Sequence, residues 1–320
     1  LTRAMVTETL NVPLHIQQRK RAPPLQLLDL AKLHQPMDPV LVGEVVAQVV
    51  VQEDAGIPID CIAGVSFGSI IGALYCLCLD IDEVERSLRE YMDSPLFKET
   101  MQDMELPEAE KSRSFLEQVQ ATIKHGYFYT RALLRKSFVT PETFVLHMKS
   151  LVGDKQFSDL RLPFKCMSVD LVSGEPIIFT EGDLHRALTA SCATPGFFPP
   201  VKLHGMQLVD GGVAEMIPYY TVRTFHPDYV IGVDVSRSID LINADEDIHH
   251  SLDVVFRCYD ISKEYMNIYL AREMDCIVRP NIGSFPWSDF NNFDTFIEEG
   301  YKAAMEMVPR IRKKVFWLWF

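Results

Sequence analysis

The stretch Gly64-Val65-Ser66-Phe67-Gly68 matches G-x-S-x-G, a pattern in which a serine occupies a strained turn between a strand and a helix. Such a turn exposes the hydroxyl, and the first N–H groups of the helix, from Phe67 onward, favour negative charge that develops beside it. With Gly at 16 of 320 residues, chance gives only about 0.05 matches in such a chain. The pattern predicts that Ser66 is a nucleophile; the alternative is a tight turn with an inert serine.

A serine hydroxyl is a weak nucleophile until a base takes its proton, so the chain must supply one. Four of its nine histidines lie in polar or turn-like sequence, at His204, His226, His249 and His250. None of the four accompanies other signs of a site. We therefore interpret them as surface or capping residues.

Asp210 is a stronger candidate for the base. It ends a short apolar run and is followed by Gly211 and Gly212. An aspartate at the carboxyl end of a buried strand presents its carboxylate at the edge of the sheet, and the glycines give the backbone freedom behind it. An ordinary Asp-Gly turn is the alternative interpretation.

Alternating short apolar runs and longer amphipathic segments surround these residues and predict an α/β fold, a three-layer α/β/α arrangement with a mainly parallel sheet. Strands are expected at 25–33, 59–63, 207–209, 229–233 and 275–278, and a hairpin at 164–171 and 175–180. Helices are expected at 43–54, 67–79, 82–92, 140–150, 184–193, 252–272 and 293–312. Asp82 and Glu85 are the expected capping pair of the third helix, and Thr140 is the expected cap of the fourth, with Pro141 at its first helical position. A polar excursion is expected at 94–114.

Three ordered motifs together resemble the bacterial form of the patatin-like phospholipases: 64–68, the run Ala190-Ser191-Cys192-Ala193-Thr194-Pro195-Gly196-Phe197-Phe198-Pro199-Pro200-Val201, and Asp210-Gly211-Gly212. The likeness extends from about Ala55 to Ala304. The resemblance implies a Ser66–Asp210 dyad without a histidine, hydrolysis of lipid acyl esters, and no metal or other cofactor. It also divides the chain into an N-terminal extension at 1–24, a patatin-like domain at 25–309 and a C-terminal tail at 310–320.

One part of the chain departs from that family. Patatin-like enzymes usually have a glycine-rich oxyanion loop, which by position should fall at 36–43. Here that segment contains two prolines, which have no N–H to donate, and a single glycine, Gly43. Three interpretations stay open: an active enzyme that uses Phe67 N–H and other amides, a weakened or inactive lipid-binding relative, or an N-terminal sequence, residues 1–54, that is itself in error. Acyl transfer in place of hydrolysis is a further alternative.

The charge and the composition of the chain limit the kinds of partner that we expect. The net charge of −13 argues against a broad nucleic-acid surface, and seven cysteines without zinc-like spacing favour a reduced chain. A lipid or acyl-ester substrate is expected, with a cytoplasmic or peripheral-membrane location. The tail at 310–320 has four basic residues followed by an aromatic run, which fits either an interfacial anchor or a segment docked on the core.

Overall fold

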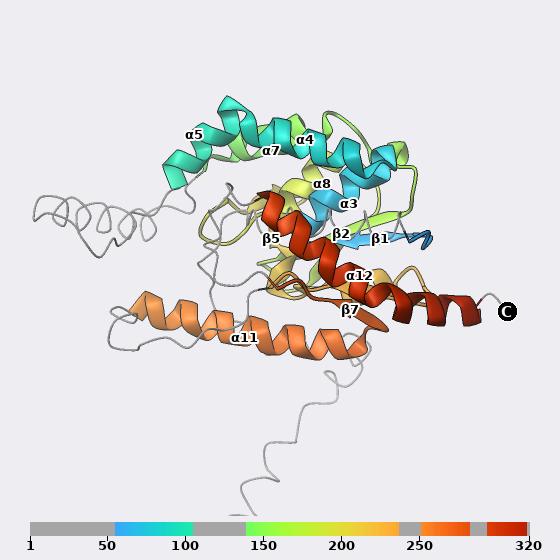
Figure 1. Cartoon of the computed structure of the whole chain (residues 1–320). Coiled ribbons are helices and arrows are strands. Elements are labelled where there is room, and N and C mark those ends of the chain that lie inside the picture. Colours follow the sequence, from blue (N-terminus) through green and yellow to red (C-terminus); the bar gives the residue numbers. More distant parts are fainter. Residues whose placement is uncertain (1–54, 105–138, 237–250, 282–292, 319–320) are drawn as a thin grey trace, which may run out of the picture. The chain divides into compact units, whose positions relative to one another are not determined.

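The computed structural model describes residues 55–104, 139–236, 251–281 and 293–318 (Figure 1). The elements in chain order are β1 (Ile62–Gly64), α3 (Phe67–Cys78), α4 (Ile81–Asp93), α5 (Pro95–Met104), α7 (Pro141–Val152), η3 (Phe157–Asp159), β2 (Phe164–Asp170), β3 (Pro176–Phe179), α8 (Leu184–Ser191), β4 (Val201–Leu203), β5 (Met206–Asp210), η4 (Gly211–Val213), α9 (Tyr219–Arg223), β6 (Ile231–Val233), α11 (Ser251–Glu273), β7 (Cys276–Val278) and α12 (Phe293–Leu318). The strand and helix expected at 25–33 and 43–54 lie outside the described residues.

The described strands form two sheets with helices on both sides, which confirms the α/β/α layering (Figure 1). One sheet has the order β1-β2-β5-β4, with β3 also paired to β2, and the other pairs β6 with β7. Pairing is mixed rather than mainly parallel: β1 and β2 are parallel, as are β6 and β7, whereas β2 runs antiparallel to β3 and β5. The β2–β3 and β4–β5 pairs are hairpins, and a short connection can only join antiparallel neighbours. The pairing of β2 with β5 is also antiparallel, although β3, α8 and β4 lie between them in the chain.

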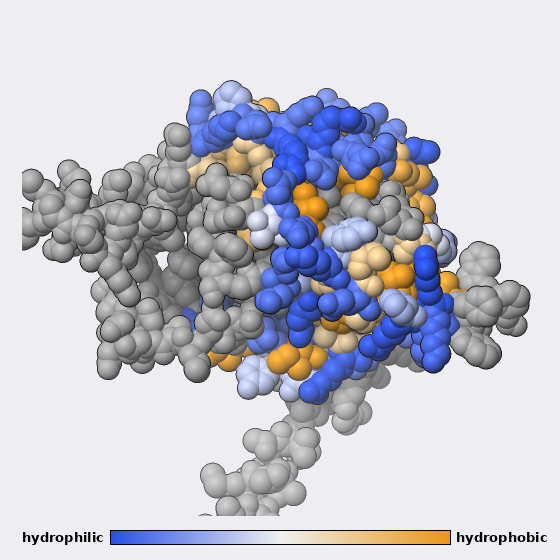
Figure 2. Space-filling model, viewed as in Figure 1, coloured by the Kyte–Doolittle hydropathy of each residue, from blue (hydrophilic) through white to orange (hydrophobic). Residues whose placement is uncertain are grey.

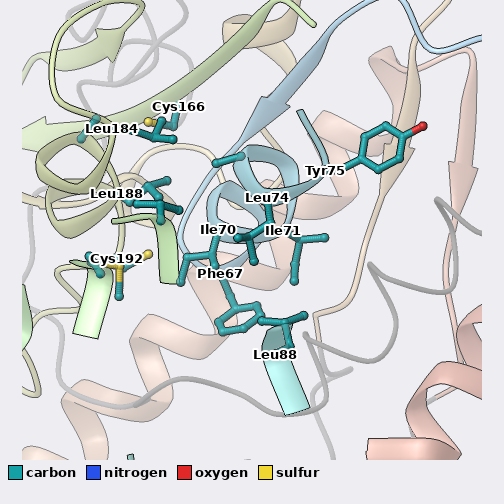
Figure 3. Close-up of a cluster of buried hydrophobic side chains, with 14 of the residues drawn as sticks. Phe67, Ile70, Ile71, Leu74, Tyr75, Leu88, Cys166, Leu184, Leu188 and Cys192 are labelled. Atoms are coloured by element: carbon teal, nitrogen blue, oxygen red, sulfur yellow. The ribbon is translucent and has the colours of Figure 1, made fainter. Parts of the chain in front are cut away.

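The main core surrounds α3, which is apolar on most sides. Figure 3 shows its Phe67, Ile70 and Leu74 side chains among residues from α8, α4 and β2. Gly72 permits this closeness on the sheet side, because a Cβ there would lie 2.9 Å from an Ile62 methyl carbon and 3.0 Å from the Phe164 ring. At Gly68, by contrast, nothing lies within 4 Å of the position that a Cβ would take.

Local signals at the helix ends explain several boundaries. Thr140 caps α7 with its hydroxyl accepting from Thr143 N–H, and Pro141 occupies the first helical position, as predicted. The cap of α4 is Asp80 rather than Asp82. Helix α3 ends at Leu79, which has the left-handed conformation. The side chain of Asp80, the next residue, then accepts from Glu83 N–H at 3.1 Å.

The C-terminal helix α12 is longer than expected, reaching Leu318, and it packs on β7. Ile311 is buried in a second apolar cluster, and Arg312 donates to the Ala55 carbonyl. These contacts favour docking on the core for the basic part of the segment at 310–320. Hydrophilic residues cover much of the described surface in the view of Figure 2, with hydrophobic residues between them.

Candidate active site

Ser66 occupies a strained turn between β1 and α3. Its backbone angles are φ 51° and ψ −131°, and a positive φ of this kind is rare for a residue with a side chain. Gly64 makes the turn possible, because a Cβ there would lie 2.4 Å from Ser69 Cα and 2.7 Å from the Gly68 carbonyl oxygen. The turn is held by Ser69, whose N–H and hydroxyl both donate to the Ser66 carbonyl.

Strand β2 brings Ser66 and Asp210 to the same level of the sheet. On one side β1 runs parallel to it, with Gly64 opposite Cys166, so Ser66 is level with Ser168. On the other side β5 runs antiparallel, and Asp210 is directly opposite Ser168. The two residues meet over β2, where both line one cavity and the Ser66 hydroxyl is among the groups that lower the pKa of Asp210.

The Asp210 carboxylate is buried, and each of its oxygens has a donor. Gly212 N–H donates to Oδ1 at 2.7 Å, and the Thr194 hydroxyl donates to Oδ2 at 3.0 Å. Burial raises the pKa of this carboxyl above its usual range, while hydrogen bonds from Ser66, Gly212 and Thr194 oppose the rise. The result is a carboxylate of increased basicity in the cavity that Ser66 also lines.

The end of α8 and the residues that follow it supply contacts that sequence reasoning missed. The hydroxyl of Ser191 accepts from Ser66 N–H at 3.1 Å, and the Ala193 carbonyl accepts from Asp210 N–H at 3.0 Å. With Thr194, these residues hold nucleophile and carboxylate together. The hydroxyls of Ser191 and Thr194, in an otherwise apolar run, were the feature of the sequence that could have indicated these contacts. Phe197 and Phe198 of the same run lie in the core, where Phe198 stacks on Phe144.

A cavity of about 700 Å³ opens beside the two residues. It is lined by both β1 and β6, and by Ser66, Asp210 and Thr194. Tyr259 and Lys263 of α11 also line it, although no sequence motif connects them to the site. The Lys263 ammonium lies 5.1 Å from the centre of the Tyr259 ring. Its positive charge is among the influences that lower the pKa of Asp210.

A sequence model described as patatin-like phospholipase matches residues 41–222, more than half of the chain. The chain belongs to the patatin-like phospholipase family. The matched region contains Ser66, Asp210 and the helices and strands that place them. Membership supports lipid acyl hydrolysis as the general class of reaction.

Three curated relatives of this patatin-like chain are distant and much longer. The neuropathy target esterase sws of Drosophila melanogaster is 23% identical over 273 residues, which cover 78% of this chain and 17% of that protein. Lysophospholipase NTE1 of Pyricularia oryzae is 23% identical over 288 residues, which cover 81% of this chain and 17% of that protein. Patatin-like phospholipase domain-containing protein 6 of Homo sapiens is 25% identical over 278 residues, which cover 78% of this chain and 18% of that protein. The chain therefore spans 17–18% of the length of these relatives.

The remaining candidates of the patatin-like site are less central. His226 is exposed in a left-handed turn at the cavity lining, and His204 is in the exposed turn between β4 and β5. His249, His250 and Gly43 lie outside the described residues. Over the described ranges, no group of three or more His, Cys, Asp or Glu side chains is arranged to hold a metal ion.

No helix in the part of the chain that the structure describes combines the length and the apolarity needed to cross a bilayer.

Proposed function

We propose that this chain hydrolyses acyl esters of lipids with Ser66 as the nucleophile and Asp210 as its base. The observation that carries the proposal is the position of Ser66, on a strained turn, in the same cavity as a buried carboxylate whose two oxygens are both fixed by donors. Family membership supports the class of substrate. The name of the Pyricularia relative supports a single-chain glycerophospholipid among the esters cleaved.

The reaction has two halves. Ser66 Oγ attacks the ester carbonyl carbon as its proton passes to Asp210, and collapse of the tetrahedral intermediate expels the alcohol, which takes that proton. Water then attacks the acyl-serine, giving a proton to Asp210, and the fatty acid leaves as the proton returns to Ser66. The raised pKa of Asp210 favours both proton transfers, because a base works best when its pKa is near the working pH.

Backbone amides at the start of α3 are the proposed oxyanion donors. The dipole and N–H groups of a helix N-terminus stabilise negative charge, and α3 begins at Phe67, directly after the nucleophile. Ser66 N–H is directed instead to Ser191 Oγ. We therefore assign Phe67 N–H as the donor nearest to the reacting carbon.

Turnover of a short-chain ester by purified protein tests the proposal. Ser66→Ala and Asp210→Asn should each lower kcat by at least about a thousandfold, and a fluorophosphonate should label wild type but not Ser66→Ala. Equal turnover by wild type and Ser66→Ala would exclude the nucleophile. A loss in His226→Ala as large as that in Asp210→Asn would transfer the role of base to the histidine.

Binding of lipid vesicles without turnover or labelling would favour the second candidate function, a lipid-binding protein that does no chemistry. The departure at 36–43 from the family's glycine-rich loop is the observation in its favour. Removal of a single oxyanion donor typically costs about 10²–10³ in kcat, so turnover should be followed long enough to detect a rate reduced by that factor.

A further inference from the structure

Helix α11 exposes a long side that carries no charge. Between positions 254 and 269, the exposed side chains that the structure describes are Val254, Val255, Cys258, Ile261, Ser262, Tyr265 and Tyr269, and we call this set the α11 face. Its two tyrosines are 58% and 62% exposed. The one small hydroxyl is satisfied within the helix, because Ser262 donates to the Cys258 carbonyl at 2.9 Å.

Other helices of this chain expose charge instead. Every exposed side chain of α4 is acidic or basic, and so are most of those of α12. In the same stretch of α11, the charged side chains that the structure describes are only half-exposed: Arg257, Asp260, Lys263 and Glu264. In a chain with a net charge of −13, one side of a helix is therefore free of exposed charge over about four turns. An exposed apolar surface of this kind indicates an interaction site.

The α11 face is narrow. Val254, Ile261, Tyr265 and Tyr269 follow one another at intervals of seven, four and four residues, so they form one stripe along the helix. The stripe is about 22 Å long at 1.5 Å per residue, and a helix is about 10–12 Å across. Its area is thus on the order of a few hundred Å², whereas a stable protein interface needs about 800 Å² from each partner. The area argues against a second copy of the chain as the occupant.

Two observations favour a lipid surface instead. Tyrosine is typical of the boundary between lipid and water, because its ring is apolar and its hydroxyl is polar. Tyr259 and Lys263 are two residues before and after Ile261, which places them on the opposite side of the helix. There they line the cavity that Ser66 also lines. One helix therefore connects the α11 face with the site at which an acyl ester would react.

We propose that the α11 face binds a lipid bilayer, with the helix axis parallel to the membrane surface. Its apolar side chains and tyrosine rings enter the boundary between headgroups and acyl chains, as those of interfacial helices do. The choice of a bilayer rests on the proposed function, because a hydrolase of lipid esters meets its substrate at an interface. The α11 face contains neither Ser66 nor Asp210, so the docking is testable without turnover.

Co-sedimentation of the Ser66→Ala protein with vesicles of dioleoylphosphatidylcholine is the first test. Tyr265→Asp combined with Tyr269→Asp should weaken binding by at least about tenfold, because two charges would have to enter the interface. Tyr265→Trp combined with Tyr269→Trp should retain it. The matched control is Leu146→Asp combined with Met305→Asp, which adds the same charge at exposed positions of α7 and α12. Binding by this control should stay within about twofold of that of the Ser66→Ala protein.

Cys258 permits a second measurement that needs no substitution in the α11 face. It is the exposed one among the seven cysteines, all of which lie in the described residues. A polarity-sensitive maleimide dye on Cys258 should emit at shorter wavelength when vesicles are added, with dye-treated Cys258→Ser protein as the background. Unchanged emission, equal weakening by the two aspartate pairs, or no binding to vesicles would overturn the docking.

Self-association and turnover separate the remaining outcomes. A dimer in sedimentation velocity that Tyr265→Asp with Tyr269→Asp dissociates would overturn the docking and assign the α11 face to a second copy. With Ser66 intact, a soluble short-chain ester should be hydrolysed equally by wild type and by this aspartate pair. Vesicle binding without hydrolysis of any ester would remove the proposed function alone, and hydrolysis without vesicle binding would remove the docking alone.

Discussion

Thr194 fixes the second oxygen of the proposed base. Its hydroxyl donates to Asp210 Oδ2 at 3.0 Å, while Gly212 N–H already occupies Oδ1. Hydrogen bonds to the ionised form of a carboxylate lower its pKa, and here they act against the desolvation that raises it. Thr194 is thus a positioning residue that acts on the reaction through Asp210.

Thr194→Val should lower activity and move its pH dependence. Without the hydroxyl, the pKa of Asp210 rises further, so the acid limb of the pH profile of kcat/KM should move to higher pH. The rate at neutral pH should fall by about tenfold, the scale of one lost hydrogen bond to a charged group. Thr194→Ser should restore the wild-type profile. An unchanged acid limb in Thr194→Val would limit Thr194 to packing.

Single residues of the site differed in how far sequence predicted them. Ser66 and Asp210 were proposed from short patterns with a chemical reason, and the structure places both in the lining of one cavity. Lys263 could not be found in that way, because it is 53 positions from Asp210 and approaches it only through the packing of α11. Gly43 stays a prediction.

The connection of β1 to α3 depends on a close approach of backbone to backbone. The missing Cβ of Gly64 leaves room for Ser69 Cα and the Gly68 carbonyl, neither of which is the end of a flexible side chain. At Gly68 the Cβ position is open. Two glycines of one motif therefore have different structural roles.

Gly64→Ala should destabilise the fold by at least about 2 kcal/mol, since the added carbon must displace the backbone of the first turn of α3. Gly68→Ala is the matched control, and it should be neutral or stabilising by up to about 1 kcal/mol because alanine is the better helix former. Urea unfolding of the two variants beside wild type measures both. Similar losses of stability in both variants would contradict the steric assignment.

Elements with strong local signals were predicted well. Thr140 with Pro141 located the start of α7, and the turn at 172–174 located the hairpin of β2 and β3. β4 was missed because it has three residues and follows two prolines, although His204-Gly205 between it and β5 is a hairpin turn. The mixed pairing of β2 depends on contacts far apart in sequence, which local periodicity does not report.

At the scale of the whole molecule, the free energy of unfolding depends on two buried titratable groups outside the dyad. The two groups change it in opposite directions as the pH rises. His147 is 1% exposed and its ring nitrogens are hydrogen-bonded to the hydroxyls of Tyr91 and Thr100, at 2.8 and 2.9 Å. Burial lowers the pKa of this histidine to about 4. Glu215 is 4% exposed, and burial raises its pKa to about 7.

His147 should make the fold sensitive to acid. Between pH 6.5 and about 4 the unfolded chain binds a proton here that the folded chain does not bind, so stability is lost as the pH falls through this range. The loss at pH 5 should be about 2 kcal/mol. Because Glu215 titrates alike in wild type and in His147→Gln, this loss is measured by urea unfolding at pH 7 and pH 5 as the decrease in the free energy of unfolding of wild type relative to His147→Gln. An equal acid loss in the variant would assign the effect to other groups.

Glu215 should make the fold less stable as the pH rises. From pH 4.5 to about 7 the folded chain retains a proton that the unfolded chain releases, so stability falls as the pH rises through this window and the penalty is complete above it. Glu215→Gln keeps the shape and an oxygen that accepts from Thr221 N–H, but has no proton to lose. Relative to wild type, its free energy of unfolding should increase by about 3 kcal/mol between pH 4.5 and pH 8.

Thermal and urea unfolding at the two pH values measure this change. His147→Gln is the control, because its stability relative to wild type should change in the opposite direction between the same two pH values. A constant difference between Glu215→Gln and wild type across the window would show that Glu215 titrates near its ordinary pKa, with water reaching the carboxyl in the folded protein.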